Sequence, residues 1–574
     1  MMPAPSCPVP GSGPTGAARQ SSGAVRHAWP CVVLLCAAVA GCGGGSVDHL
    51  PGQSTFGIGG TVSGLTGTLV LQDNGGDDLR VTGDGAFRFA TPLVNGAYYS
   101  VTIAGQPVGS TCAVSNAGGA VSGSVDTVLV QCNASAASGR WSWVDGVRTI
   151  DESGQYGSQG TAASANLPGA REAPGAWTDA NGHFWLFGGY GYDADGQSGL
   201  LNDLWQFEPA VGQWVWMGGA AAVGAAGSYG TQGQAAAGNV PGAREAAAVW
   251  ADHSGQLWLF GGLGADASQN AVQFNDLWKY QPVTGQWTWV AGPSMPDGTG
   301  SYGMQGVAAA GNVPPARAYG LTWVDSTGVL WLFGGAQYDA SGVSEVFDDL
   351  WSFDPTTDLW TWVSGSSAPN ATGSYGTRGT AASTNQPGAR AAAATWVDAA
   401  GNLWLLGGYG ADQQGKLGEL NDLWRYSPGT AEWTWIAGAA SAGAGGIYGT
   451  QGTAAAGNMP GARVTATAWT DASGDFWLFG GYGYDQADQA DDLGDLWKYD
   501  PGLGEWTWVS GSSRAGASGN YGMQGTASAG SLPGAREQAG SWRDTAGDLW
   551  LFGGYGFDWL GNQDDLDDLW SFAP

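Results

Sequence analysis

Between residues 56 and 132, apolar and polar residues alternate in four short runs that are separated by glycine-rich turns. The runs are residues 67–71, 86–89, 98–103 and 127–130. A period of two predicts strands with one buried face, because successive side chains of a strand point to opposite sides of its sheet. We therefore predict a small β-sandwich over residues 55–133, followed by a linker over residues 134–139.

Beyond the linker, one hydrophobic pattern recurs without insertion or deletion. An arginine that ends a Pro-Gly-Ala-Arg tetrad or a close variant returns at a constant interval, and a glycine doublet and a Leu-Trp pair keep the same interval. A constant period of this kind is the signature of a repeat architecture. The arginines are Arg171, Arg244, Arg317, Arg390, Arg463 and Arg536.

Four strands are predicted in each copy, which in the first copy are residues 171–178, 184–187, 203–207 and 213–216. Four antiparallel strands make one blade of a β-propeller. The connections from the second to the third strand, of about 13 residues, and from the fourth strand to the next copy, of about 25, are the long ones. Strand alternation places both sets on one face, which we expect to be the working surface.

The sixth copy ends after its third strand. Its fourth strand is found upstream, because Trp141 and Trp143 lie exactly one repeat interval before Trp214 and Trp216. An N-terminal strand that completes the last blade removes the open edges of a linear array. The sequence therefore predicts a closed six-bladed β-propeller over residues 140–574.

These motifs carry a family resemblance. A glycine doublet after an aromatic and aliphatic strand, then Asp-Leu-Trp, then Trp-x-Trp, with arginine opening the next unit, resembles the kelch repeat over residues 139–574. Kelch units are usually about 50 residues long, so the longer loops here depart from the family. The resemblance implies binding of a protein or glycan at the long-loop face. The alternative is a carbohydrate-active enzyme similar to the kelch sialic acid epimerases.

The arginines open the innermost strands and are expected to ring one mouth of the central channel. They could bind a carboxylate ligand, or pair with the aspartate that precedes each Leu-Trp; we favour the structural pair. Three copies place a glutamate after the arginine, where the others have alanine or valine. Glu172, Glu245 and Glu537 are the acid/base candidates if the propeller is an enzyme.

One tryptophan and a second set of aspartates are further candidates for ligand or metal binding. Of 32 tryptophans, 30 recur in every copy and are expected to pack between blades, whereas Trp559 stands where other copies have Ala or Gln and is a candidate ligand contact. The aspartates that follow the glycine doublet could cap their loops or hold calcium; we favour capping and expect no metal or cofactor. They are Asp193, Asp266, Asp339, Asp412, Asp485 and Asp558.

The N-terminal segment is typical of an export signal. Residues 31–40 are apolar but too short to span a bilayer, and Val39-Ala40-Gly41-Cys42 resembles a bacterial lipobox. We expect a signal peptide over residues 1–41, lipidation at Cys42 and a glycine-rich tether over residues 42–54. An ordinary cleaved signal is the alternative. The resemblance implies an outer-membrane lipoprotein that faces the periplasm or the cell surface.

The net charge and the number of cysteines exclude some classes of ligand and cofactor. The net charge of −30 and the lack of any Lys/Arg run argue against nucleic-acid binding, and we expect a monomer held at the membrane only by its lipid. Cys112 and Cys132 are expected to form a disulfide in an oxidising compartment. A copper oxidase like galactose oxidase is not expected, because the propeller has no cysteine and its two histidines, His183 and His253, flank short turns.

Overall fold

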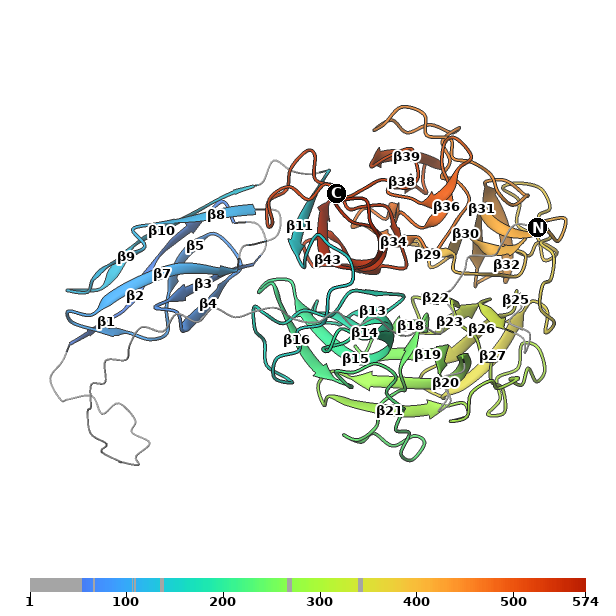
Figure 1. Ribbon diagram of the computed structural model, residues 1–574, viewed down its shortest axis with the longest axis horizontal. Coiled ribbons are helices and arrows are strands. Elements are labelled where there is room, and N and C mark those ends of the chain that lie inside the picture. Colours follow the sequence, from blue (N-terminus) through green and yellow to red (C-terminus); the bar gives the residue numbers. More distant parts are fainter. Residues whose placement is uncertain are drawn as a thin grey trace, which may run out of the picture. The chain divides into compact units, whose positions relative to one another are not determined.

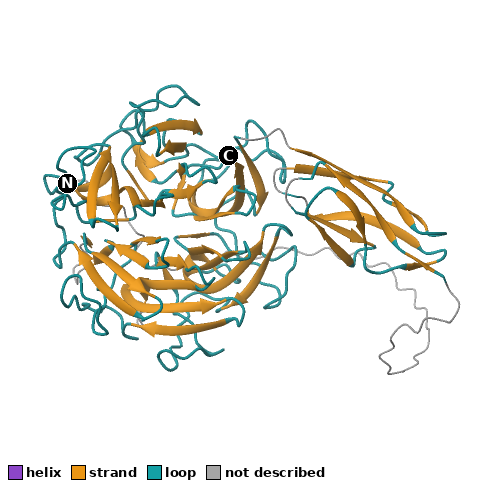
Figure 2. Cartoon of the chain, turned by 180° about the vertical axis from the view of Figure 1, so that it is seen from behind, coloured by secondary structure: helices purple, strands orange, loops and turns teal. Residues whose placement is uncertain are grey.

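The computed structural model describes residues 54–65, 68–105, 107, 110–134, 139–265, 271–338 and 344–574. Throughout these residues the secondary structure consists of strands, turns and loops, as Figure 2 shows. No helix among them is long and apolar enough to cross a membrane. The predicted signal peptide, tether and lipidation at Cys42 lie outside the described residues and stay predictions.

The N-terminal module consists of two four-stranded sheets with a buried core between them. One sheet has the order β5-β2-β10-β8 and the other β4-β3-β7-β9, while β1 pairs with β6. Core side chains such as Leu71, Val101 and Val128 come from both sheets. The strands are β1 Thr55–Phe56, β2 Ile58–Ser63, β3 Leu69–Asp73, β4 Asp77–Val81, β5 Gly85–Arg88, β6 Leu93–Val94, β7 Tyr98–Gly105, β8 Ser110–Ser115, β9 Gly118–Ala120 and β10 Val125–Ala134.

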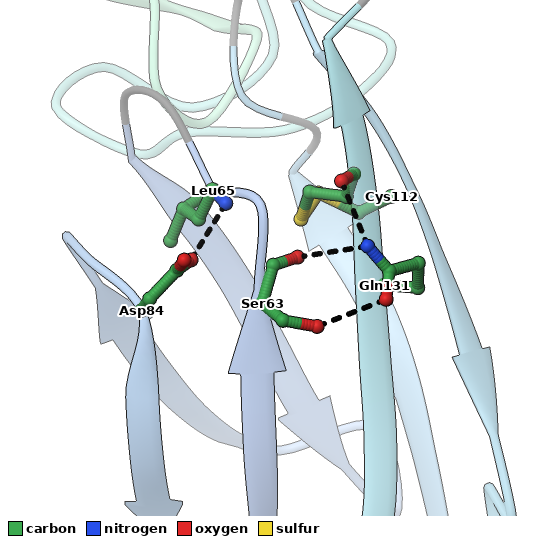
Figure 3. The surroundings of a disulfide bond; sticks show 6 residues. Ser63, Leu65, Asp84, Cys112 and Gln131 are labelled. Atoms are coloured by element: carbon green, nitrogen blue, oxygen red, sulfur yellow. Dashed lines mark hydrogen bonds between the residues drawn. A yellow bond between two sulfur atoms is a disulfide. The ribbon is translucent and has the colours of Figure 1, made fainter.

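The predicted disulfide between Cys112 and Cys132 is present. The two cysteines are directly opposite each other in the antiparallel pair β8–β10. On the other side of β10, Gln131 and Ser63 join the parallel strand β2 through a hydrogen bond of 3.0 Å between their side chains (Figure 3). The disulfide therefore covalently links two neighbouring strands of one sheet.

The rest of the chain forms one repeated sheet pattern arranged around a common centre (Figure 1). In the first copy the order is β12-β14-β15-β16, with β13 beside β14. The strands of this copy are β12 Arg171–Glu172, β13 Gly175–Thr178, β14 Phe184–Tyr192, β15 Ser198–Glu208 and β16 Gln213–Gly218. The predicted first strand is thus two short strands, broken at Ala173, whose φ of 49° lies in the left-handed region.

The other copies repeat this arrangement. Their strands are β17 Arg244–Glu245, β18 Ala248–Ala251, β19 Leu257–Ala265, β20 Ala271–Gln281 and β21 Gln286–Ala291; β22 Leu321–Val324, β23 Leu330–Phe333, β24 Ala336–Tyr338, β25 Ser344–Val346, β26 Leu350–Asp354 and β27 Leu359–Ser364; β28 Arg390–Ala391, β29 Ala394–Val397, β30 Leu403–Ala411, β31 Leu417–Ser427 and β32 Glu432–Ala437; β33 Arg463–Val464, β34 Thr467–Thr470, β35 Phe476–Phe479, β36 Tyr482–Tyr484, β37 Ala490–Asp492, β38 Leu496–Asp500 and β39 Glu505–Ser510; and β40 Arg536–Glu537, β41 Gly540–Arg543, β42 Leu549–Phe557 and β43 Gln563–Ala573.

The predicted loop of about 13 residues between the second and third strands is wrong. β14 continues past Gly188 and Gly189 through a bulge, and only residues 193–197 connect it to β15. Both glycines have positive φ, and a Cβ on Gly188 would lie 2.6 Å from the carbonyl oxygen of Arg244. The doublet therefore bends the strand where a neighbouring copy approaches closely, instead of ending it.

Tryptophan side chains join each copy to the next. The indole N–H of Trp177 donates to the carbonyl of Trp258 at 3.0 Å, and the same bond recurs around the array until Trp542 donates back to Trp185. The innermost strands contact one another in the same cyclic order, from β13 through β18, β22, β29, β34 and β41 back to β13. The recurrent tryptophans thus pack between copies, as predicted.

The N-terminal strand of the propeller closes the array. β11 (Arg140–Asp145) pairs with β43, with Trp141 opposite Phe572 and Trp143 opposite Trp570. Figure 1 shows the teal β11 beside the red β43. Trp141 is 1% exposed and packs against Phe479 of the neighbouring copy. The prediction of an N-terminal strand that completes the last blade is therefore confirmed.

Candidate functional site

The recurrent arginines are buried in a hydrogen-bonded network. Arg171 is 0% exposed and bonds both carboxylate oxygens of Asp203, at 2.7 and 2.8 Å, while its Nε and Nη1 atoms donate to the backbone carbonyls of Gly169 and Gly188. Tyr156 and Trp205 also donate to Asp203. The same pairs recur as Arg244–Asp276, Arg317–Asp349, Arg390–Asp422, Arg463–Asp495 and Arg536–Asp568.

This network confirms the structural Arg–Asp pair. The alternative, in which the arginines bind a carboxylate ligand, needs guanidinium N–H groups at the channel surface, and all six arginines are at most 1% exposed. The adjacent Asp203 and Asp276 raise the pKa of Arg171 and Arg244 despite the opposing effect of burial. The arginines therefore hold the first and third strands of each copy together and offer no donor to a ligand.

The second aspartate set caps the turns of the long-loop face. Oδ1 of Asp193 accepts the backbone N–H groups of Asp195 and Gln197, and Oδ2 accepts that of Val223. The equivalent residues Asp412, Asp485 and Asp558 make the same turn contacts. The capping interpretation is confirmed for these four, while Asp266 and Asp339 lie outside the described residues.

The centre of the propeller contains a closed ring of backbone hydrogen bonds. Each member donates its N–H to the carbonyl of the equivalent residue one copy earlier, at 2.8 to 3.1 Å. All members have positive φ, between 49° and 58°. The ring consists of Ala173, Ala246, Tyr319, Ala392, Thr465 and Gln538. It lines a cavity of about 190 Å³ together with the residues that follow it, such as Pro174 and Gly320.

Glu172, Glu245 and Glu537 lie one residue before this ring, on its long-loop side. They belong to consecutive copies, since the copy of Glu537 closes against that of Glu172. Glu245 is buried, and Glu172 and Glu537 are half-buried. Burial raises the pKa of Glu245 to about 7, and burial together with neighbouring carboxylates raises the pKa of Glu172 to about 10. The structure thus gathers the three glutamates at one side of the channel mouth.

Two aspartates that the sequence analysis missed join them. Asp492 and Asp565 are 1% and 3% exposed, and both contribute to the raised pKa of Glu172. Burial and Glu537 raise the pKa of Asp492 to about 8. The signal was present in the sequence, because three of the other four copies place Leu200, Gln273 and Val346 at this position. We call Glu172, Glu245, Glu537, Asp492 and Asp565 the acidic arc.

Trp559 lies at the turn between β42 and β43 and is 45% exposed, as predicted. The guanidinium carbon of Arg148 lies 4.8 Å from the centre of its ring, and its backbone N–H donates to the Arg148 carbonyl. The neighbouring Leu560 is 62% exposed. One face of the indole is therefore covered by an arginine, while the rest remains available at the long-loop face.

Part of the propeller resembles a known family of repeats. Residues 232–445 match the family model described as the KLHDC2/KLHL20/DRC7 Kelch-repeats domain. A solved structure titled "Structure of YjhT" aligns with 16% identity over 70% of this chain and 95% of that chain, with a TM-score of 0.42. No curated protein matches the sequence. The repeated four-stranded sheets define a β-propeller, and the part of it over residues 232–445 matches kelch repeats.

Proposed function

We propose that this protein is a binding module, which presents the long-loop face of its propeller to a protein or glycan ligand. The observation that carries the proposal is the asymmetry of this face. Trp559 is exposed where equivalent positions hold Ala194, Gln413 or Gln486, and the acidic arc comes from the fifth, sixth, first and second copies only. Repeat packing does not require an exposed aromatic side chain at this one position, so a ligand accounts for Trp559 better.

Anchoring at a membrane belongs to the same proposal. The lipobox-like sequence that ends in Cys42 and the glycine-rich residues behind it support a lipid anchor. The β-sandwich would then act as a spacer between the anchor and the propeller. Metabolic labelling with a radiolabelled fatty acid, with Cys42→Ala as the control, tests this part: loss of label in the variant supports the anchor, and retained label contradicts it.

A binding array tests the proposed function. The full chain is applied to immobilised glycans and cell-surface proteins, beside Trp559→Ala and the control Leu503→Ala. Leu503 is 69% exposed in a turn of the opposite face. We expect a ligand whose binding is reduced by Trp559→Ala and unchanged by Leu503→Ala. Equal binding by all three proteins would contradict a role of the long-loop face.

A kelch enzyme that acts on a carbohydrate is the second candidate. One observation favours it: burial places the pKa of Glu245 at about 7, where a carboxyl group exchanges protons readily at neutral pH. The buried arginines weigh against an epimerase that holds a substrate carboxylate with them. An epimerase assay with sialic acids, repeated with Glu245→Gln, separates the two candidates, because turnover that depends on Glu245 would establish an enzyme.

A further inference from the structure

The acidic arc contains carboxylate oxygens without a hydrogen-bond partner. Asp492 Oδ1 and Asp565 Oδ1 are both buried, and neither has a partner among the described residues. The other oxygen of Asp492 accepts the side-chain amide of Gln563 at 3.0 Å. An unpaired buried carboxylate oxygen is costly, because it has lost water without gaining a donor. Each of these two oxygens therefore offers an acceptor that a hydrogen-bond donor would satisfy.

The two aspartates interact with glutamates of their own copy and of neighbouring copies. Asp565 is paired with Tyr555 across the sheet, and Tyr555 with Glu537. The charge of Asp565 in turn acts on Glu172 of the next copy, and the charge of Glu537 acts on Asp492 of the preceding copy. Asp565, Glu245, Glu537 and Asp492 all add to the effect of burial in raising the pKa of Glu172, so the five carboxyl groups form one electrostatic cluster.

Among the described residues, no lysine or arginine side chain forms an ion pair with a member of this cluster. Arg171 and Arg536 act on Asp565 and Asp492, yet each is already bonded to both oxygens of its own aspartate. Other charged and titratable groups that act on the cluster are acidic or phenolic, namely Asp151, Asp491, Asp564 and Tyr192. A cationic ligand would therefore meet carboxyl groups that have no counter-ion of their own.

Two tyrosines are paired across the sheet with members of the acidic arc. Tyr555 lies between Glu537 and Asp565, and Tyr482 between Val464 and Asp492. Both tyrosines are half-buried, so they border the solvent at the mouth. An aromatic face beside carboxylates suits an organic cation, which gains from ring and charge together. Among the described residues, no three acidic, histidine or cysteine side chains converge to hold a metal ion.

We propose that the acidic arc binds an organic cation with N–H donors, an ammonium or guanidinium group carried by the ligand of the long-loop face. Its N–H groups satisfy the free oxygens of Asp492 and Asp565, and its charge replaces the protons that Glu172 and its neighbours otherwise retain. This inference rests on the proposed function only in using the same face for binding. Binding releases protons at neutral pH, because the carboxyl groups ionise as the cation enters.

Calorimetric titration of the full chain tests the proposal with three probes. Butylammonium has a cationic N–H group, tetramethylammonium has the charge but no donor, and Ca²⁺ is a divalent metal. We expect butylammonium to bind at least tenfold more tightly than the other two. Titrations in buffers of different ionisation enthalpy should show proton release. Equal affinity for tetramethylammonium, preference for Ca²⁺, or absence of proton release would overturn the proposal.

Variants locate the site. Glu172→Gln and Asp565→Asn should each weaken butylammonium binding at least tenfold. The same variants should raise the melting temperature, because they remove buried carboxyl groups without a counter-ion, so weaker binding cannot be ascribed to misfolding. The control Asp195→Asn removes one exposed charge from the same face and should change neither quantity. Equal weakening by the control would show nonspecific attraction and overturn the site.

The two proposals fail separately. An array ligand whose binding depends on Trp559 but not on Glu172 or Asp565 leaves the binding module in place and overturns the cation site. Butylammonium binding that depends on Glu172, without any array ligand, supports the cation site while the proposed protein or glycan ligand fails.

Discussion

The hydroxyl of Tyr319 donates a hydrogen bond of 3.0 Å to Oε1 of Gln538. The two residues occupy the same position three copies apart, at opposite points of the backbone ring. The four other members of the ring have the smaller side chains of alanine or threonine. The Tyr319 side chain therefore reaches across the channel at the level of the ring.

Removing the hydroxyl of Tyr319 should destabilise the centre of the propeller, because its hydrogen bond to Gln538 is lost. Tyr319→Phe is expected to lower the free energy of unfolding by about 1 kcal/mol, the usual contribution of one hydrogen bond. Denaturant titration of Tyr319→Phe, Gln538→Ala and the double variant measures the coupling. The effects of the two single changes should sum to more than that of the double change. Strict additivity would mean that the bond contributes nothing to stability.

Breaking one buried ion pair should destabilise the propeller strongly. Arg317→Ala leaves Asp349 charged and buried, and we expect a loss of about 3–5 kcal/mol in the free energy of unfolding. Arg514→Ala is the control, because that side chain is 62% exposed and lies 3.8 Å from Asp485. The control should change stability by less than about 1 kcal/mol, as surface pairs do. Comparable losses in both variants would contradict the structural role of the arginine network.

Deleting the closing strand should open the propeller. A chain that begins after Asp145 lacks β11 and exposes the edge of β43, so we expect it to aggregate, whereas a chain that begins at Gly139 should remain monomeric. Size-exclusion chromatography with light scattering distinguishes the two. A synthetic peptide of residues 139–146 should restore the monomer by adding the missing strand. A stable monomer without β11 and without peptide would contradict the closure.

Trp559→Ala should separate binding from folding. Because the ring is 45% exposed and contacts Arg148 from one side, its loss should cost at most about 1 kcal/mol of stability. Binding of the ligand found on the array should weaken about tenfold or more, as for an aromatic interaction hot spot. Surface plasmon resonance and thermal melting measure the two effects. A large fall in melting temperature with unchanged affinity would show that Trp559 serves folding and does not contact the ligand.

The acidic arc should make stability fall with rising pH. Glu172 keeps its proton in the folded state up to a pKa of about 10, but loses it near 4.5 when unfolded. Its stabilising contribution is therefore complete below pH 4.5 and is lost progressively as the pH rises toward 10, at no more than about 1.4 kcal/mol per pH unit. Glu172→Gln cannot titrate and should flatten this slope in denaturant titrations between pH 5 and 9. Parallel curves for both proteins would contradict the raised pKa.

The regular part of the structure could be predicted because each element recurs at the constant interval that separates Arg171 from Arg244. The pairing of Arg171 with Asp203 and the closure through Trp141 both follow from comparing equivalent positions. The acidic arc could not be predicted in full. Asp565 lies in a part of β43 for which the pattern predicts a loop, since a glycine doublet usually ends a strand. Only the continuation of β42 through its own doublet brings Asp565 to the mouth.

The contact between Tyr319 and Gln538 was also beyond prediction. Each residue differs from its counterparts, but nothing along the chain indicates that positions three copies apart meet across the centre. Their separation in space is set by the diameter of the ring and the positive φ of its members, which the sequence pattern does not report.

The pairing of β11 with β43 also sets an order of events in time. Arg140 lies opposite Ala573, so the first strand of the propeller to leave the ribosome must wait for the last. Contacts so distant along the chain form late, because a long loop must close before they can be made. Until then β11 has no strand to pair with, and the blades that have already folded leave the propeller open. The nascent chain most needs protection from other chains during this interval.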